Sequence, residues 1–266
     1  MEEKEEKIMK HIFETHAHYD DEWFDEDREK LLSSFSKNGI ETVVNVAASL
    51  SSIPTTIALA EQYEFIYAAI GVHPSETKEL TEENFSIVKQ MAQHKKAVAV
   101  GEIGLDYYWD STERSIQKYW FERQIELARE LQKPLVIHSR DAAQDTMDMM
   151  KALHTEEIGG VIHCFSNSVE MAKEYIKMGF YIGVGGVVTF KNARVLKEVV
   201  RTVPLEQIVL ETDSPYLAPM PYRGKRNCSL YLPQIVTAIS ELKQVSEEEV
   251  VQVTNQNAHR LYWLEE

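Results

Sequence analysis

The chain is poor in cysteine and has no long apolar runs. Cys164 and Cys228 are its only cysteines. This fits two free thiols in a reducing cytoplasm, although the sequence is also compatible with one disulfide between them. No apolar run approaches the ~20 residues that a membrane-spanning helix needs. The charged start, MEEKEEKIMKH, lacks the hydrophobic stretch of a signal peptide. We therefore expect a cytoplasmic protein without membrane contact.

Basic residues are also scarce. Lys and Arg number 28 against 43 Asp and Glu, for a net charge of −15. This balance argues against broad electrostatic capture of nucleic acid, which normally needs a basic surface. A polyanionic substrate would have to be held by local positive charge. Metal ions or the basic cluster YRGKRN at 222–227 are the candidates.

Short apolar runs that alternate with helical patterns fill the chain. The strand candidates are 11–16, 42–47, 66–71, 97–102, 134–138, 160–163, 180–184 and 207–211. Continuous runs such as KAVAVGE and KPLVIH are typical of parallel strands covered on both faces. Eight strands alternating with about eight helices predict a (β/α)8 TIM barrel or, less readily, an open doubly wound sheet. We expect a single domain over 9–266, preceded by a charged, disordered extension at 1–8.

Five of the apolar runs end on residues that can hold a metal ion. The six candidate ligands are His16, His18, Glu102, His138, His163 and Asp213. Taken singly, each histidine could equally be a core histidine, but a carboxylate in such a place is costly to bury unless it is paired or coordinated. In a barrel the carboxyl ends of all strands lie on one face, whereas the first and last strands of an open sheet are usually too far apart. The set therefore favours the barrel and predicts a metal centre.

Six ligands exceed the three protein ligands of a typical catalytic zinc site and suffice for two divalent ions. We expect one ion on His16, His18 and Asp213, the other on His138 and His163, and Glu102 shared between them. Asp213 would accept the proton of the attacking water, so Glu102 and Asp213 are the catalytic candidates. The ligand types do not select among Zn, Mn, Ni, Co and Mg.

The motifs around these residues resemble the TatD family of metal-dependent deoxyribonucleases, within the amidohydrolase-type barrels. The resemblance runs from residue 12 to the end and includes THAH, GVHP at 71–74, VGEIGLDYYW at 100–109, HCFS at 163–166, ETDSPYLAP at 211–219 and RGKRN at 223–227. It implies a TIM barrel, one or two divalent ions on the six residues, and hydrolysis of DNA phosphodiester bonds, in some members as a 3′→5′ exonuclease.

The chain departs from the family pattern at two places. Glu14 stands where the family usually has Asp, which puts the surroundings of His16 in doubt. Cys228 and Ser229 follow RGKRN where the family usually continues with Glu-Pro, which puts substrate contacts of that loop in doubt.

Four further residues are candidates for substrate binding. His73 ends a predicted strand, and we expect it to contact a substrate phosphate. Arg140 could reach a phosphate or pair with an acid such as Asp141. Arg223 and Lys225 lie in the basic cluster, where phosphate binding competes with a plain solvated loop.

The leading interpretation is a metal-dependent nuclease acting on DNA ends or short single strands. Aromatic residues at 107–109 could stack on bases or pack under their loop. The alternative is a hydrolase of the same architecture acting on an ester or amide bond, such as an aminoacyl-tRNA linkage, because the same metal set serves both. A scaffold with a structural metal is disfavoured. The sequence leaves the oligomeric state open.

Overall fold

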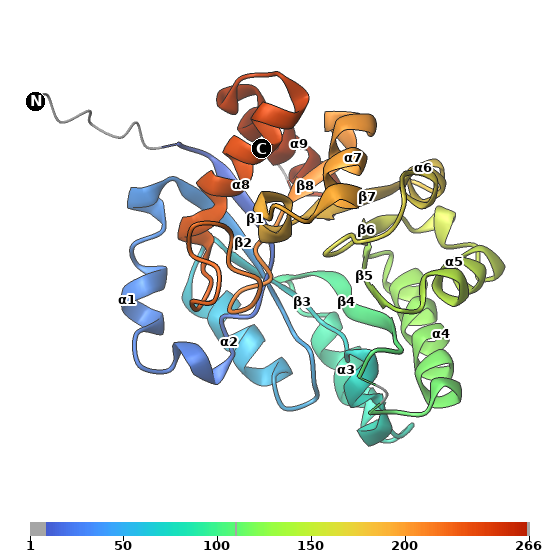
Figure 1. The fold of residues 1–266 in the computed structure, drawn as a ribbon. Helices are drawn as coiled ribbons and strands as arrows, with labels where there is room; N and C mark the ends of the chain where they lie inside the picture. Colours follow the sequence, from blue (N-terminus) through green and yellow to red (C-terminus); the bar gives the residue numbers. More distant parts are fainter. Residues whose placement is uncertain (1–8, 110, 265–266) are drawn as a thin grey trace, which may run out of the picture.

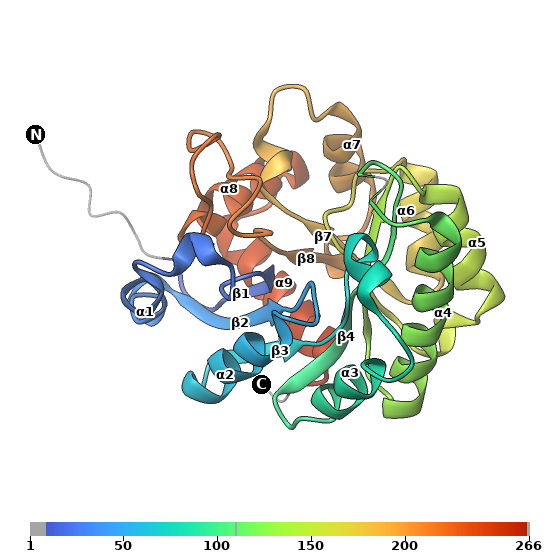
Figure 2. The same ribbon diagram turned by 90° about the horizontal axis from the view of Figure 1, so that it is seen from below.

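The computed structural model describes residues 9–109 and 111–264, and the expected extension at 1–8 lies outside them. Eight parallel strands pair in sequence order, and helices surround them, as the end-on view in Figure 2 shows. The strands in Figure 1 are β1 (Ile12–Ala17), β2 (Ile40–Val46), β3 (Ile66–Ala69), β4 (Ala97–Asp106), β5 (Leu135–Arg140), β6 (Gly160–Ile162), β7 (Phe180–Val184) and β8 (Ile208–Leu210). The predicted TIM barrel is confirmed.

The α-helices follow the strands, with two of them after β8. They are α1 (Arg28–Leu32), α2 (Ile53–Gln62), α3 (Phe85–Ala92), α4 (Arg114–Leu131), α5 (Ala143–Ala152), α6 (Val169–Lys177), α7 (Arg194–Thr202), α8 (Leu232–Lys243) and α9 (Glu247–Tyr262). Short 3-10 helices are η1 (Glu22–Phe24), η2 (Ser36–Asn38), η3 (Pro74–Glu79), η4 (Thr155–Glu157), η5 (Gly186–Thr189), η6 (Leu205–Gln207) and η7 (Ser229–Tyr231). Across the described ranges, none of the helices has the length and apolar character needed to span a membrane.

The barrel closes where its first and last strands meet. The backbone N–H of Asp213 donates to the carbonyl of His16 at 3.0 Å, and the N–H of His18 donates to the carbonyl of Ser214 at 2.8 Å. Below them, the Thr15 hydroxyl donates to the carbonyl of Leu210. The candidate ligands of β1 are thereby joined directly to the segment that follows β8.

The observed strands agree with the predicted runs, except that β4 is longer. All ten of its residues are buried, as expected for a strand covered on both faces. It continues to Asp106 because the ladder with β5 runs from Ile103 opposite Ile137 to Asp106 opposite Arg140. Glu102 therefore lies inside its strand rather than at its end, and His138 lies inside β5. The prediction that each ligand ends its strand is therefore wrong at these two positions. It is inexact at His16, which precedes the last residue of β1, and at Asp213, which lies three residues beyond β8.

Candidate metal centre

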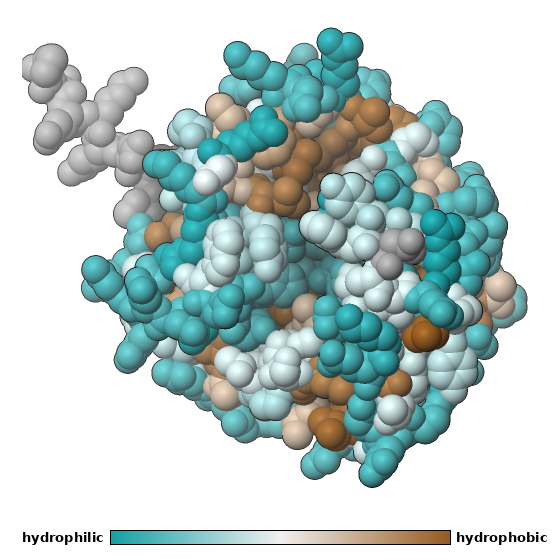
Figure 3. Space-filling model, turned by 60° about the horizontal axis from the view of Figure 1, so that its bottom comes forward, coloured by the Kyte–Doolittle hydropathy of each residue, from teal (hydrophilic) through white to brown (hydrophobic). Residues whose placement is uncertain are grey.

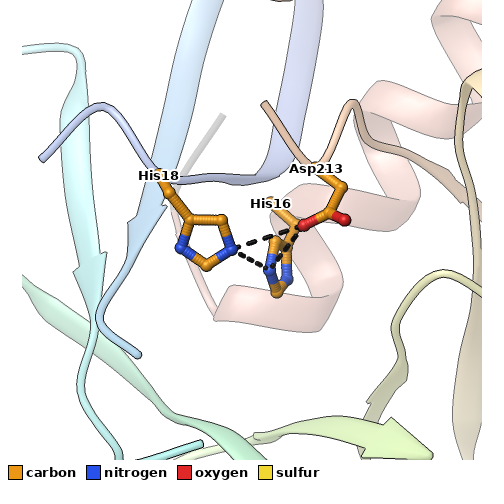
Figure 4. A group of neighbouring side chains, drawn as sticks. All are labelled: His16, His18 and Asp213. Atoms are coloured by element: carbon orange, nitrogen blue, oxygen red, sulfur yellow. Dashed lines mark hydrogen bonds and ion pairs between the residues drawn. The ribbon is translucent and has the colours of Figure 1, made fainter. Parts of the chain in front are cut away.

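The six expected ligands converge at the carboxyl end of the barrel. Figure 4 shows His16 and His18 from β1 and its end facing Asp213 from the segment after β8. The Nε2 atoms of the two histidines lie 3.2 Å apart. Asp213 Oδ1 lies 3.3 Å from Nε2 of His18 and 3.7 Å from Nε2 of His16. Both imidazoles are buried, so their nitrogens form a compact donor cluster shielded from water.

Glu102 lies between two sets of imidazoles. Its Oε2 atom is 3.5 Å from His16 Nε2 and 3.8 Å from His18 Nε2. Its Oε1 atom is 2.7 Å from His138 Nδ1 and 3.0 Å from His163 Nε2. The His16 and His163 rings are stacked, with centroids 3.7 Å apart. A carboxylate whose two oxygens face different donor groups has the placement that a ligand shared by two ions requires.

The histidines present the right nitrogens for ligation. His18 Nδ1 lies 2.7 Å from the carbonyl oxygen of Val46, which requires a proton on Nδ1 and leaves the Nε2 lone pair for an ion. His138 Nε2 lies 3.0 Å from Asp106 Oδ2, so Nδ1, 2.7 Å from Glu102 Oε1, is the nitrogen that faces the centre. A ligating histidine normally donates its second ring N–H to a carbonyl or carboxylate in this way. The donor set therefore fits divalent ions.

Asp106 and Glu211 were missed by the sequence reasoning. Asp106 orients His138 through a hydrogen bond, and Glu211 Oε1 lies 3.6 Å from His163 Nδ1 as a charged neighbour. A signal for Glu211 existed in the sequence, because it ends the strand predicted over 207–211 and directly follows β8. Asp106 lies four residues beyond Glu102 on the same side of β4, which is apparent only once the strand is known to extend that far.

The carboxylates of the centre are held in their ionised form. Burial alone would raise the pKa of Glu102, but the charge of His163 and hydrogen bonds with His138 and His16 hold it well below its usual range. Burial likewise opposes the charge on His18, yet the hydrogen bond and charge of Asp213 raise the pKa of His18 to about 9, so a bound ion has to displace the proton from its Nε2 atom. Buried ionised carboxylates require compensating positive charge, which divalent ions provide.

His73 lies beside the centre, as expected for a residue that faces it. Its Nε2 atom is 3.9 Å from Glu102 Oε1, and its ring centroid is 4.3 Å from that of His138. These three residues also have donor atoms close enough together to hold an ion. Burial and the neighbouring His138 lower the pKa of His73 to about 3, so the imidazole is neutral. Its Nδ1 accepts the N–H of Ser75, which places the single ring proton on Nε2, facing the site.

The two departures from the family pattern contact one another. The Glu14 side chain is fully buried. Its Oε1 atom accepts the N–H of Thr212 at 2.8 Å and that of His16 at 3.3 Å, and its Oε2 atom accepts the hydroxyl of Ser229 at 2.8 Å. Glu14 thus ties β1 to the end of β8 and to η7. Its extra methylene, compared with Asp, gives it the reach for all three donors.

We expect Glu14→Asp to destabilise the protein and to loosen the metal centre at His16. The shorter side chain cannot satisfy both Thr212 and Ser229, and a buried donor left unpaired costs about 1–3 kcal/mol. The free energy of unfolding, measured by denaturant titration in chelator, should fall by that amount, and metal affinity should fall with it. Glu41→Asp makes the same change at an exposed position of β2 and should be neutral. Equal stability of Glu14→Asp and the wild type would contradict the role of Glu14.

The three cationic substrate candidates, Arg140, Arg223 and Lys225, each lie over a different aromatic ring. The Arg140 guanidinium stacks over the Tyr108 ring at 3.8 Å. Arg223 lies 4.6 Å over the Phe190 ring, and Lys225 lies 5.8 Å from the Tyr222 ring. Arg226, in the same basic loop, donates two 2.7 Å hydrogen bonds to Asp27, so the Asp27 carboxylate balances its positive charge.

The face that carries the loops after the strands is hollowed. Figure 3 shows a hydrophilic hollow there, with pale side chains of intermediate hydropathy around it. Tyr108 and Trp109 are exposed, while the Tyr107 hydroxyl donates to Asp145 at 2.7 Å. Tyr107 therefore packs under its loop, and its two neighbours are accessible.

An eight-stranded barrel with buried imidazole and carboxylate clusters at the carboxyl ends of its strands defines a metal-dependent hydrolase. The chain belongs to the TatD family, because the model of that family, described as TatD related DNase, matches residues 13–263.

Relatives with similar sequences and structures agree with this assignment. The uncharacterized metal-dependent hydrolase YabD of Bacillus subtilis is 43% identical over 251 residues, covering 94% of this chain and 98% of YabD. The uncharacterized metal-dependent hydrolase YcfH of Escherichia coli K12 is 34% identical over 257 residues, covering 96% of each chain. The crystal structure of YjjV, a TatD homolog from Escherichia coli K12, superposes with a TM-score of 0.90 at 28% identity, covering 96% of this chain and 99% of YjjV.

Proposed function

We propose that the protein hydrolyses phosphodiester bonds of DNA at ends or in short single strands. The observation that carries the proposal is the placement of Glu102 between two sets of imidazoles, which suits a pair of ions acting on one phosphate. The family description as a DNase supports the choice of substrate. The free thiols of Cys164 and Cys228 are compatible with action in the cytoplasm.

In this proposal one or two divalent ions, of Zn, Mn, Ni, Co or Mg, are held by the six ligands. His16, His18 and Asp213 hold one ion, His138 and His163 hold the other, and Glu102 serves both. Such ions lower the pKa of a water molecule and offset charge on the phosphate.

Asp213 accepts the proton of the attacking water. Although burial opposes its charge, the hydrogen bond with His18 and the charge of His163 lower the pKa of Asp213, so it is ionised at neutral pH and able to accept a proton. Its Oδ1 atom lies 3.3 Å from Nε2 of His18, within the proposed ligand set.

The substrate phosphates are bound by local donors, as the acidic net charge requires. His73 offers its Nε2–H toward the centre. Arg140, Arg223 and Lys225 supply positive charge held over aromatic rings.

Labelled oligonucleotides test the function directly. Single-stranded and double-stranded DNA would be incubated with the wild type in each of the five metals, and Asp213→Asn would serve as the inactive control. Metal-dependent cleavage by the wild type alone is the expected result. If DNA and RNA stay intact while a panel of esters, amides or an aminoacyl-tRNA is cleaved, the same centre acts on carbonyl carbon and the nuclease proposal is wrong.

Reversing charge at the basic loop should weaken DNA turnover. We expect the double variant Arg223→Glu and Lys225→Glu to lower kcat/KM on oligonucleotides about 10-fold or more and to reduce the salt slope by about 2, one for each phosphate that the loop no longer binds. Hydrolysis of bis(p-nitrophenyl) phosphate should be unchanged. Lys37→Glu with Lys173→Glu makes the same charge change at exposed positions of η2 and α6. Equal behaviour of the two double variants would rule out the phosphate role.

A further inference from the structure

Two exposed aromatic rings lie directly beside the metal centre. Trp23, in η1 after β1, is 56% exposed, and Tyr216, after β8, is 47% exposed. Their ring centroids are 6.3 Å apart. The Tyr216 ring is 6.4 Å from that of His18, and the Tyr216 N–H donates to the carbonyl of Asp213. The two rings therefore extend from the ligands themselves toward solvent.

Polar contacts hold the hydroxyl of Tyr216 and the backbone of Trp23 in place. Asp21 uses one carboxylate oxygen for the Tyr216 hydroxyl, at 2.9 Å, and the other for the N–H of Trp23, at 2.8 Å. Arg226 donates to the carbonyl of Trp23 at 2.7 Å and is itself held by Asp27. Aromatic surface that is exposed yet already ordered binds a ligand with little further loss of conformational freedom.

The local charge indicates what kind of group can lie on these rings. The arginines beside η1, Arg28 and Arg226, are already paired with Asp25 and Asp27. Asp21 touches both Trp23 and Tyr216, and Glu22 lies in η1. These carboxylates repel a phosphate, so the surface around Trp23 and Tyr216 is unsuited to the DNA backbone. The uncharged face of a nucleobase is not repelled, and every base can stack on an aromatic ring.

We propose that Trp23 and Tyr216 form a stacking site for the nucleobase adjacent to the cleaved bond. This inference rests on the proposed function and names its substrate more closely. A base inside a duplex is already paired and stacked, so only an unpaired nucleotide can place its base on these rings while its phosphate lies at the metal ligands. The site therefore selects single-stranded or frayed ends.

Variants combined with abasic substrates test the stacking. Trp23→Ala and Tyr216→Ala should each lower kcat/KM on a single-stranded oligonucleotide about 10-fold. They should show no loss on the same oligonucleotide with an abasic nucleotide at the cleaved end, placed at the 3′ or the 5′ end in separate substrates. Tyr216→Phe, which keeps the ring, should retain most of the activity.

Trp263→Ala, which removes an equally exposed tryptophan at the end of α9, is the matched control. Equal losses on normal and abasic substrates would overturn the stacking site, because the rings would then act by supporting the metal ligands. An absence of any loss would overturn it as well.

A binding measurement separates this inference from the proposed function. Oligonucleotides ending in 2-aminopurine would be titrated with Asp213→Asn and with the same variant carrying Tyr216→Ala. We expect Asp213→Asn to quench the 2-aminopurine fluorescence. The double variant should quench it at least 5-fold less. If the wild type cleaves no DNA, the proposed function fails. If the fluorescence is not quenched, the stacking site fails, whatever the result of cleavage.

Discussion

Replacing Glu102 with alanine should deplete the protein of metal and lower turnover by about 1,000-fold or more. Glu102 faces both sets of imidazoles, so its loss weakens both ions together. Ions that offset charge at a reacting phosphate contribute several kcal/mol to transition-state stabilisation. Metal analysis of the purified protein, beside kcat/KM on a single-stranded oligonucleotide, measures both effects.

Two further variants make the result interpretable. Glu102→Gln keeps the shape of the side chain and removes only its charge, so it should fold normally and still lose metal. Glu122→Ala, at an exposed position of α4, should behave as the wild type. Unchanged metal stoichiometry in both Glu102 variants would exclude a shared ligand, whatever their turnover.

Asp213→Asn should lower kcat by about 100-fold to 10,000-fold, the range expected for loss of a positioned base. Asparagine is the informative replacement because Asp213 has a φ of +58°, a left-handed conformation that Asn tolerates and Ala does not favour. The amide keeps an oxygen for the ion but cannot accept the proton of water. Steady-state kinetics with metal content measured on the same sample test this.

The expected pattern is a large loss of kcat with at least one ion retained. Asp213→Ala would add backbone strain and the loss of a ligand, so it should lose more metal than Asp213→Asn. A pH–rate profile whose acidic limb is the same in Asp213→Asn as in the wild type would assign the base to another group.

The fold was predictable because its signals are local. Each strand is a short run of Val, Ile and Ala bounded by polar residues, and the alternation with helices admits few arrangements. The convergence of the ligands followed from the barrel alone, since strand ends of a barrel share one face. His16 and Asp213 could be placed together on that ground although 197 positions separate their numbers.

What escaped prediction depends on contacts that no local pattern encodes. The end of β4 is set by its ladder with β5, so the run AVAVGE gave no indication that the strand continues to Asp106. The partnership of Glu14 with Ser229 joins residues 215 positions apart. In sequence these two departures from the family pattern look unrelated, and only the closed barrel shows that one compensates the other.

The seam between β1 and β8 has a consequence for how the enzyme is made. The metal centre takes His16 and His18 from the first strand and Asp213 from beyond the last, and the backbone hydrogen bonds between them form only when both are present. A ribosome synthesises the histidines long before the aspartate. The growing chain therefore holds an incomplete donor set during most of its synthesis, and the set is complete only when the barrel closes.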